Sequence, residues 1–151
     1  MLKSLVVSTP RAVASLVLTL ALLCGGPALA QGPDAKVRVT VIHATKDGTS
    51  VAPDLGDLAK YLVKSFAPYT AFKTLDRQQV TLAAGASSKL ALPNGSELIY
   101  RNDGRANGFV ALHLEVGGLK TTVNVKDGGT FFQAGRSYEG GMIVLAFAVD
   151  P

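Results

Sequence analysis

The sequence is poor in the residue types that most often carry chemistry. Its 151 residues include one cysteine, two histidines and no tryptophan. A single cysteine forms no disulfide within the chain, and it excludes zinc sites that need several thiolates. No serine lies in the Gly-x-Ser-x-Gly turn of the α/β-hydrolases, and no glycine-rich stretch ends in the Lys-Ser/Thr of a phosphate-binding loop. The motifs therefore give no sign of nucleophilic, zinc-thiolate or nucleotide chemistry.

Long apolar runs are also lacking. The two longest are Ala12–Leu23, with twelve residues, and Met142–Val149, with eight. A membrane-spanning helix needs about 20 apolar residues, so we expect no membrane span in residues 31–151. Both faces of the C-terminal run are apolar, which is typical of a strand covered on each side. We expect this run to lie in the protein core.

The first thirty residues have the three parts of a secretory signal peptide. Lys3 and Arg11 give a basic start, Ala12–Leu23 is the apolar region, and Ala28 and Ala30 are small residues at positions −3 and −1 of a cleavage site. We expect cleavage after Ala30 and export to the periplasm by the general secretory route. The alternative is an uncleaved membrane anchor.

Cys24 raises a second alternative, an outer-membrane lipoprotein. Lipidation needs a small residue directly before the cysteine, and here Leu22 and Leu23 precede it. We therefore expect a periplasmic protein without a lipid anchor. After cleavage at Ala30 the chain would contain no cysteine.

Charge is nearly balanced along the chain. The whole sequence has 15 Lys and Arg against 11 Asp and Glu, a formal net charge of +4. Loss of Lys3 and Arg11 with the leader leaves 13 basic residues and a net charge of +2. The charges are scattered, whereas a nucleic-acid-binding surface needs a concentrated basic patch. Nucleic acid is therefore excluded as a partner.

Residues 36–151 have the size of one domain, preceded by a flexible lead at residues 31–35. The segment 36–44 alternates apolar and polar residues, which predicts a half-buried strand. Residues 54–66 place Leu55, Leu58, Ala59, Leu62 and Phe66 on one face of a helix. Proline follows at position 68, where we expect the helix to have ended.

The rest of the sequence predicts strands. Asn-Gly and Asp-Gly pairs between short apolar segments favour tight hairpin turns. The predicted strands are 69–76, 78–83, 88–93, 96–102, 108–116, 119–126, 130–134 and 141–149. The predicted fold class is α+β: a mostly antiparallel β-sandwich or meander of about eight or nine strands, with one amphipathic helix after the first strand.

Only weak signs of a catalytic or metal site are present. His43 and His113 lie on predicted strands, and Glu115 is near the second. Their separation matches no metal-ligand spacing, and structural zinc usually needs four ligands. We expect hydrogen-bonded strand histidines, no metal, no cofactor and no catalytic residues, so the chain is predicted not to be an enzyme. A hydrolase that uses a histidine and an acid is the less favoured alternative.

Several aromatic and charged side chains near predicted turns are candidates for contact with a partner or ligand. They are Tyr69, Phe72, Arg101, Asp103, Arg105, Arg136 and Tyr138. The competing interpretation is that the aromatic residues fill the core and the charged residues cover hairpin tips. Among the aromatic residues, Tyr69 and Tyr138 adjoin proline or glycine-rich turns, so we expect them to be partly exposed.

Three segments carry a resemblance to a protein group: "VIHATKDGTSVAPDLGDLAKYLVKSFAPYTAFKTLD", "LPNGSEL" and "GGTFFQAGRSYEGGMIVLAFAV". The chain resembles small secreted α+β proteins of myxobacteria and relatives, similar in type to periplasmic components of the gliding-motility envelope machinery. The absence of a nucleophile, metal set or phosphate loop in an exported domain favours a non-catalytic protein-interaction module. The resemblance implies that this module is a soluble component of a multi-protein envelope assembly and contacts other envelope proteins. The alternative function is a carrier of a small ligand or glycan.

Overall fold

The computed structural model describes residues 34–151, which belong to one compact unit that begins at Gln31. The predicted leader, its cleavage site and Cys24 lie outside the described residues, as does most of the predicted lead. Within residues 34–151 the helices are too short for a membrane span.

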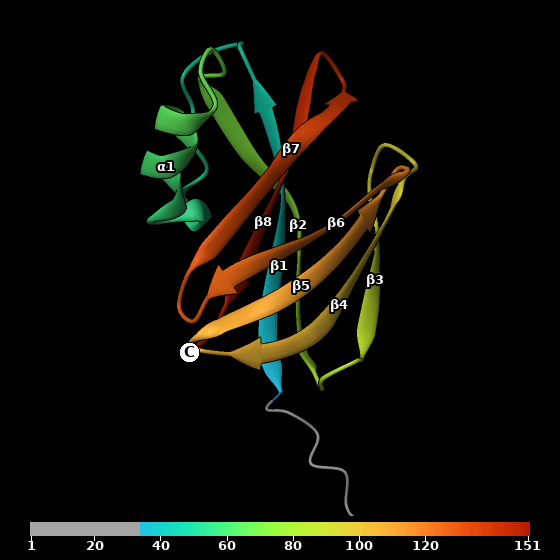
Figure 1. Ribbon diagram of the computed structural model, residues 1–151. Helices are drawn as coiled ribbons and strands as arrows, with labels where there is room; N and C mark the ends of the chain where they lie inside the picture. The colour runs from blue at the N-terminus through green and yellow to red at the C-terminus, as the bar shows by residue number, and fades with distance from the viewer. Residues whose placement is uncertain (1–33) are drawn as a thin grey trace, which may run out of the picture. The chain divides into compact units, whose positions relative to one another are not determined.

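Eight strands form two four-stranded antiparallel sheets (Figure 1). In chain order they are β1 (Ala35–Thr45), β2 (Ala71–Leu82), β3 (Ser87–Ala91), β4 (Glu97–Ala106), β5 (Phe109–Val116), β6 (Leu119–Lys126), β7 (Thr130–Tyr138) and β8 (Gly141–Val149). One sheet has the order β2-β1-β8-β7, and the other has the order β3-β4-β5-β6. The predicted α+β class, with one helix after the first strand, is confirmed.

The strand β2 differs from the sequence prediction. Segments 69–76 and 78–83 are predicted as two strands, but they form one strand that pairs with β1 over its whole length. Val41 pairs with Asp76 and Ile42 with Thr74, so Leu75 is an extra residue in a β-bulge. A bulge bends a strand without ending it. Between Leu75 and the end of β2 there is no glycine or proline that would turn the chain.

The two sheets are joined at both edges. The β2–β3 connection crosses between the sheets at one edge, and residues 127–129 cross at the other as β6 leads into β7. Figure 1 shows β6 and β7 diverging from this connection, each on the outside of its sheet. The edges of the two sheets therefore separate toward the β5–β6 turn.

The strand β8 confirms the expectation for the C-terminal run. Ile143, Leu145 and Phe147 are at most 3% exposed and belong to the cluster between the sheets. Val144 and Ala146 face the opposite way, into a second cluster on the helix-bearing side. Burial on both faces explains why every position from 142 to 149 is apolar.

The helical region is interrupted where the sequence predicts one helix over 54–66. A 3₁₀ helix, η2 (Pro53–Leu55), precedes α1 (Leu58–Ser65). Gly56 separates them with a φ of +50°, a backbone conformation outside the helical range. Leu55 and Leu62 are buried against the sheet, so the predicted apolar face is correct although the helix is shorter.

Candidate functional site

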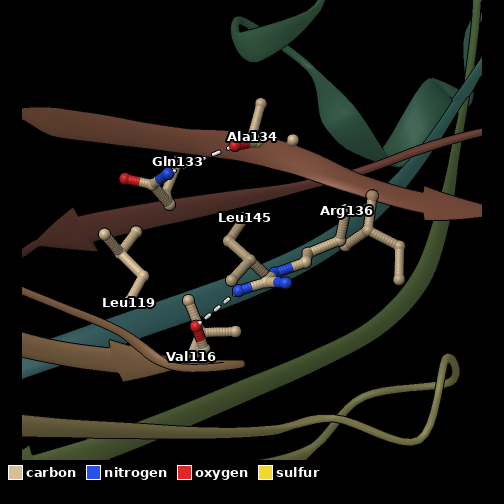
Figure 2. A pocket seen from close by; sticks show the side chains of 8 residues that line it. Val116, Leu119, Gln133, Ala134, Arg136 and Leu145 are labelled. Atoms are coloured by element: carbon tan, nitrogen blue, oxygen red, sulfur yellow. Dashed lines mark hydrogen bonds between the residues drawn. The ribbon is translucent and has the colours of Figure 1, made fainter.

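An apolar opening lies between the two sheets where β6 and β7 diverge (Figure 2). Its volume is about 270 Å³. Apolar side chains from both sheets line it: Val116, Leu119, Ile143 and Leu145. Residues 133–136 of β7 form the polar side of the wall. The opening is the accessible end of the inter-sheet core.

The edge strands leave this opening uncovered. β6 pairs only with β5, and β7 pairs only with β8. Leu119, the first residue of β6, is therefore 40% exposed, although it lies in the wall of an apolar cavity. An exposed strand edge beside an apolar wall is a common place for another chain to pair.

A β-bulge in β7 lies at the side of the opening. Ala134 pairs with Val144 and Arg136 with Ile143, so Gly135 is the extra residue. Gly135 has a φ of +123°, which a glycine adopts without strain. Bulges redirect the side chains that follow them. Arg136 comes directly after the bulge and reaches across to the other sheet, as Figure 2 shows.

The guanidinium of Arg136 bridges the sheets. Its Nη2 donates to the carbonyl oxygen of Val116 at 2.9 Å and to that of Gly117 at 2.5 Å. A Cβ atom at Gly117 would overlap the guanidinium, so the glycine makes room for it. Within residues 34–151 the Nε and Nη1 atoms of Arg136 donate to no acceptor. Part of the fork-shaped donor set therefore stays free.

Arg136 differs from the other arginines in the described part of the chain. It has no carboxylate partner there. The other four arginines each lie beside a carboxylate: the pairs are Arg38–Asp150, Arg77–Asp54, Arg101–Asp103 and Arg105–Asp127. The opening thus combines an apolar wall with an unneutralised cation, an arrangement suited to an apolar group that carries a negative charge.

The predicted contact residues Arg101 and Asp103 form a pair with each other on β4. The Nε of Arg101 donates to one carboxylate oxygen of Asp103, and Nη2 donates to the other at 3.3 Å. The hydrogen bond from Arg101 holds the pKa of Asp103 below its ordinary value. Within the pair, each charge is balanced by the other.

This pair gives a pH-dependent prediction. Because the pKa of Asp103 is lowered in the folded state, the pair stabilises the fold above the unfolded-state pKa, and this contribution is lost as the pH falls through the folded-state pKa. We expect Arg101→Gln to raise the pKa of Asp103 toward its ordinary value. An NMR titration of the Asp103 carboxyl carbon measures it; equal midpoints in both proteins would contradict the pairing.

Arg105, another predicted contact residue, is tied to the C-terminal end of the chain. Its Nη2 lies 3.5 Å from Oδ1 of Asp127 and donates to the carbonyl oxygen of Asp150 at 3.5 Å. The Arg105 side chain is only 19% exposed. Its position indicates a structural role at the end of β8, away from the opening.

The predicted aromatic residues do not form one surface. Phe72 is 1% exposed and packs in the cluster beneath α1, so it presents no surface to a partner. Tyr69 and Tyr138 are both partly exposed, as expected. Tyr69 packs against the helix-side cluster, and Tyr138 against the inter-sheet cluster. These two tyrosines therefore lie on different sides of the sheet.

The two histidines are hydrogen-bonded and lie in different sheets. Nε2 of His43 donates to the carbonyl oxygen of Tyr138 at 3.0 Å. His113 lies 3.1 Å from both Thr122 Oγ1 and Glu115 Oε1, on the outer face of β5. In the part of the chain that the structure describes, no three potential metal-ligating side chains come together. The expectation of hydrogen-bonded strand histidines is confirmed.

Arg136 is among the contact residues predicted from the sequence, whereas Leu119 is not. The available signal was an apolar residue directly after the Gly117-Gly118 turn, at the start of a strand that otherwise carries many polar residues. Comparison with protein-family models, curated proteins and solved structures finds no match to this chain.

Proposed function

We propose that this chain is a non-catalytic protein-interaction module of the periplasm, and a soluble component of a multi-protein envelope assembly of the gliding-motility type. Its partners are other envelope proteins. The predicted leader and the resemblance to small myxobacterial secreted proteins support the location and the type of assembly. The β6 and β7 edges support the mode of contact.

One observation carries the proposal. Two unpaired strand edges border the same apolar opening, and Leu119 in its wall is 40% exposed. A partner that adds a strand to such an edge forms backbone hydrogen bonds and places alternate side chains in the adjoining pocket. The carrier alternative is less well supported, because Tyr69 and Tyr138 belong to separate clusters.

Site-specific photocrosslinking in the native envelope tests the proposal. Lys120 follows Leu119 on β6, and its side chain is 69% exposed. We expect a photoreactive residue at position 120 to capture a discrete envelope protein, because the partner lies along this edge. The matched control is the same residue at exposed Lys60 on α1, far along the chain from β6. The proposal would be contradicted if neither position captured a protein, or if positions 120 and 60 captured the same proteins.

A further inference from the structure

We infer that the opening between β6 and β7 binds the C-terminal end of a partner chain. The partner's last side chain is apolar and enters the cavity, and its terminal carboxylate binds Arg136. This inference rests on the proposed function and specifies the chemistry of the partner. Three features of the opening support it: its free cation, its size and its strand edge.

The first feature is the charge of Arg136. Every other arginine in residues 34–151 lies beside a carboxylate, whereas Arg136 contacts only the carbonyl oxygens of Val116 and Gly117. Both contacts use Nη2, so the Nε and Nη1 donors remain for a ligand. Each of these donors can form a charge-assisted hydrogen bond to a carboxylate oxygen, which is stronger than a hydrogen bond between neutral groups. The occupant that complements this site is a carboxylate.

The second feature is the size of the cavity. Its volume of about 270 Å³ lies below the range of roughly 300–1,000 Å³ that is usual for sites holding a whole drug-sized ligand. Leu119, Ile143 and Leu145 give it an apolar wall, seen in part in Figure 2. A cavity of this size and lining suits one apolar side chain better than a long acyl chain.

The third feature is the backbone beside the cavity. Residues 133–136 of β7 line the opening and belong to a strand that pairs only with β8. Peptides that add to a strand edge use backbone hydrogen bonds, and some binding domains hold the terminal carboxylate as well. A fatty acid also carries a carboxylate on an apolar chain, but it has no backbone amides for this edge. The strand edge therefore favours a peptide.

Peptide binding to the chain that begins at Gln31 tests the inference. The probes are two immobilised pools of octapeptides, randomised except for a C-terminal leucine. One pool ends in a free carboxylate, and the other ends in an amide. We expect the amidated pool to bind about tenfold more weakly, because the charge-assisted hydrogen bonds are lost. Arg136→Gln should lower binding of the carboxylate pool to the same degree. Arg38→Gln removes an arginine that is paired with Asp150, and should leave binding unchanged.

A second variant covers the case in which Arg136→Gln does not fold. Leu119→Glu changes an exposed position and places a carboxylate in the wall of the cavity that Arg136 also lines. We expect it to remain folded by thermal unfolding and to lose binding of the carboxylate pool. The inference would be overturned if both pools bound equally, or if the folded variants bound the carboxylate pool as tightly as the unchanged protein. It would also be overturned if no peptide bound, or if dodecanoate bound and peptide did not. The photoreactive residue at position 120 is also introduced into the Arg136→Gln variant. If this protein still captures the same envelope partner, the inference fails while the proposed function stands.

Discussion

Replacing Asn102 by alanine is expected to lower the free energy of unfolding by about 3 kcal/mol, because a buried carbonyl oxygen and a partly buried amide lose their partners. Asn102 is fully buried on β4. Its Nδ2 donates to the carbonyl oxygen of Leu82 at 2.9 Å, and its Oδ1 accepts from the amide of Gly104 at 2.9 Å. One side chain thus joins the end of β2 to the irregular part of β4.

The backbone of Asn102 strengthens the same connection. Its amide donates to the carbonyl oxygen of Ala86 at 3.0 Å, and its carbonyl oxygen accepts from the amide of Gly85 at 2.6 Å. These bonds hold the segment that crosses from one sheet to the other. The alanine variant keeps them but loses both side-chain bonds.

Urea unfolding measures the effect of Asn102→Ala, and Asn124→Ala provides the matched control. Asn124 lies on β6 with an exposed side chain, so we expect its replacement to change stability by less than about 0.5 kcal/mol. If the two variants were equally stable, the assigned role of Asn102 would be wrong.

Replacing Gly141 by alanine is expected to destabilise the fold by about 3 kcal/mol through overpacking. Gly141 begins β8, where its backbone approaches β1 closely. A Cβ atom at this position would overlap the carbonyl oxygen of Ala44 and would lie 3.0 Å from Cγ2 of Thr45. Because Ala44 is paired with Phe72 of β2 on one side and with Met142 of β8 on the other, its backbone has little freedom to move away.

Gly140→Ala is the control for this prediction. Gly140 has a φ of +75°, but a Cβ atom there would have no neighbour within 4 Å. Its replacement should therefore cost only the backbone strain, about 1 kcal/mol. Thermal or urea unfolding compares the two variants. A smaller loss for Gly141→Ala than for Gly140→Ala would show that the close approach to β1 is absent.

Local patterns in the sequence predict the secondary structure well where one periodicity dominates. The apolar run 142–149 predicts a strand buried on both faces, and the helical spacing of Leu55 and Leu62 predicts the face that packs on the sheet. The break at Gly56 and the continuity of β2 through Leu75 are not predicted. Both depend on how the segment fits its neighbour, since a bulge is defined by the pairing partner.

The candidate site is harder to predict because it depends on contacts between distant residues. The pattern marks Arg136 as a charged residue near a turn, but its carbonyl partners are 20 and 19 positions away. The sheet register and the crossovers between sheets decide which side chains lie side by side, and therefore whether an arginine has a carboxylate partner. Likewise, Leu119 is an ordinary strand residue until the divergence of β6 and β7 leaves it uncovered.

Native-state hydrogen exchange of the chain that begins at Gln31 tests the position of β8. In the structure, β8 lies between two layers and pairs with a strand on each side, and Ile143 and Leu145 form the floor of the opening. Core strands exchange only through global unfolding. We predict that the amides of residues 143–147 exchange among the slowest in the protein. Exchange of these amides as fast as those of the edge strand β6 would contradict the account.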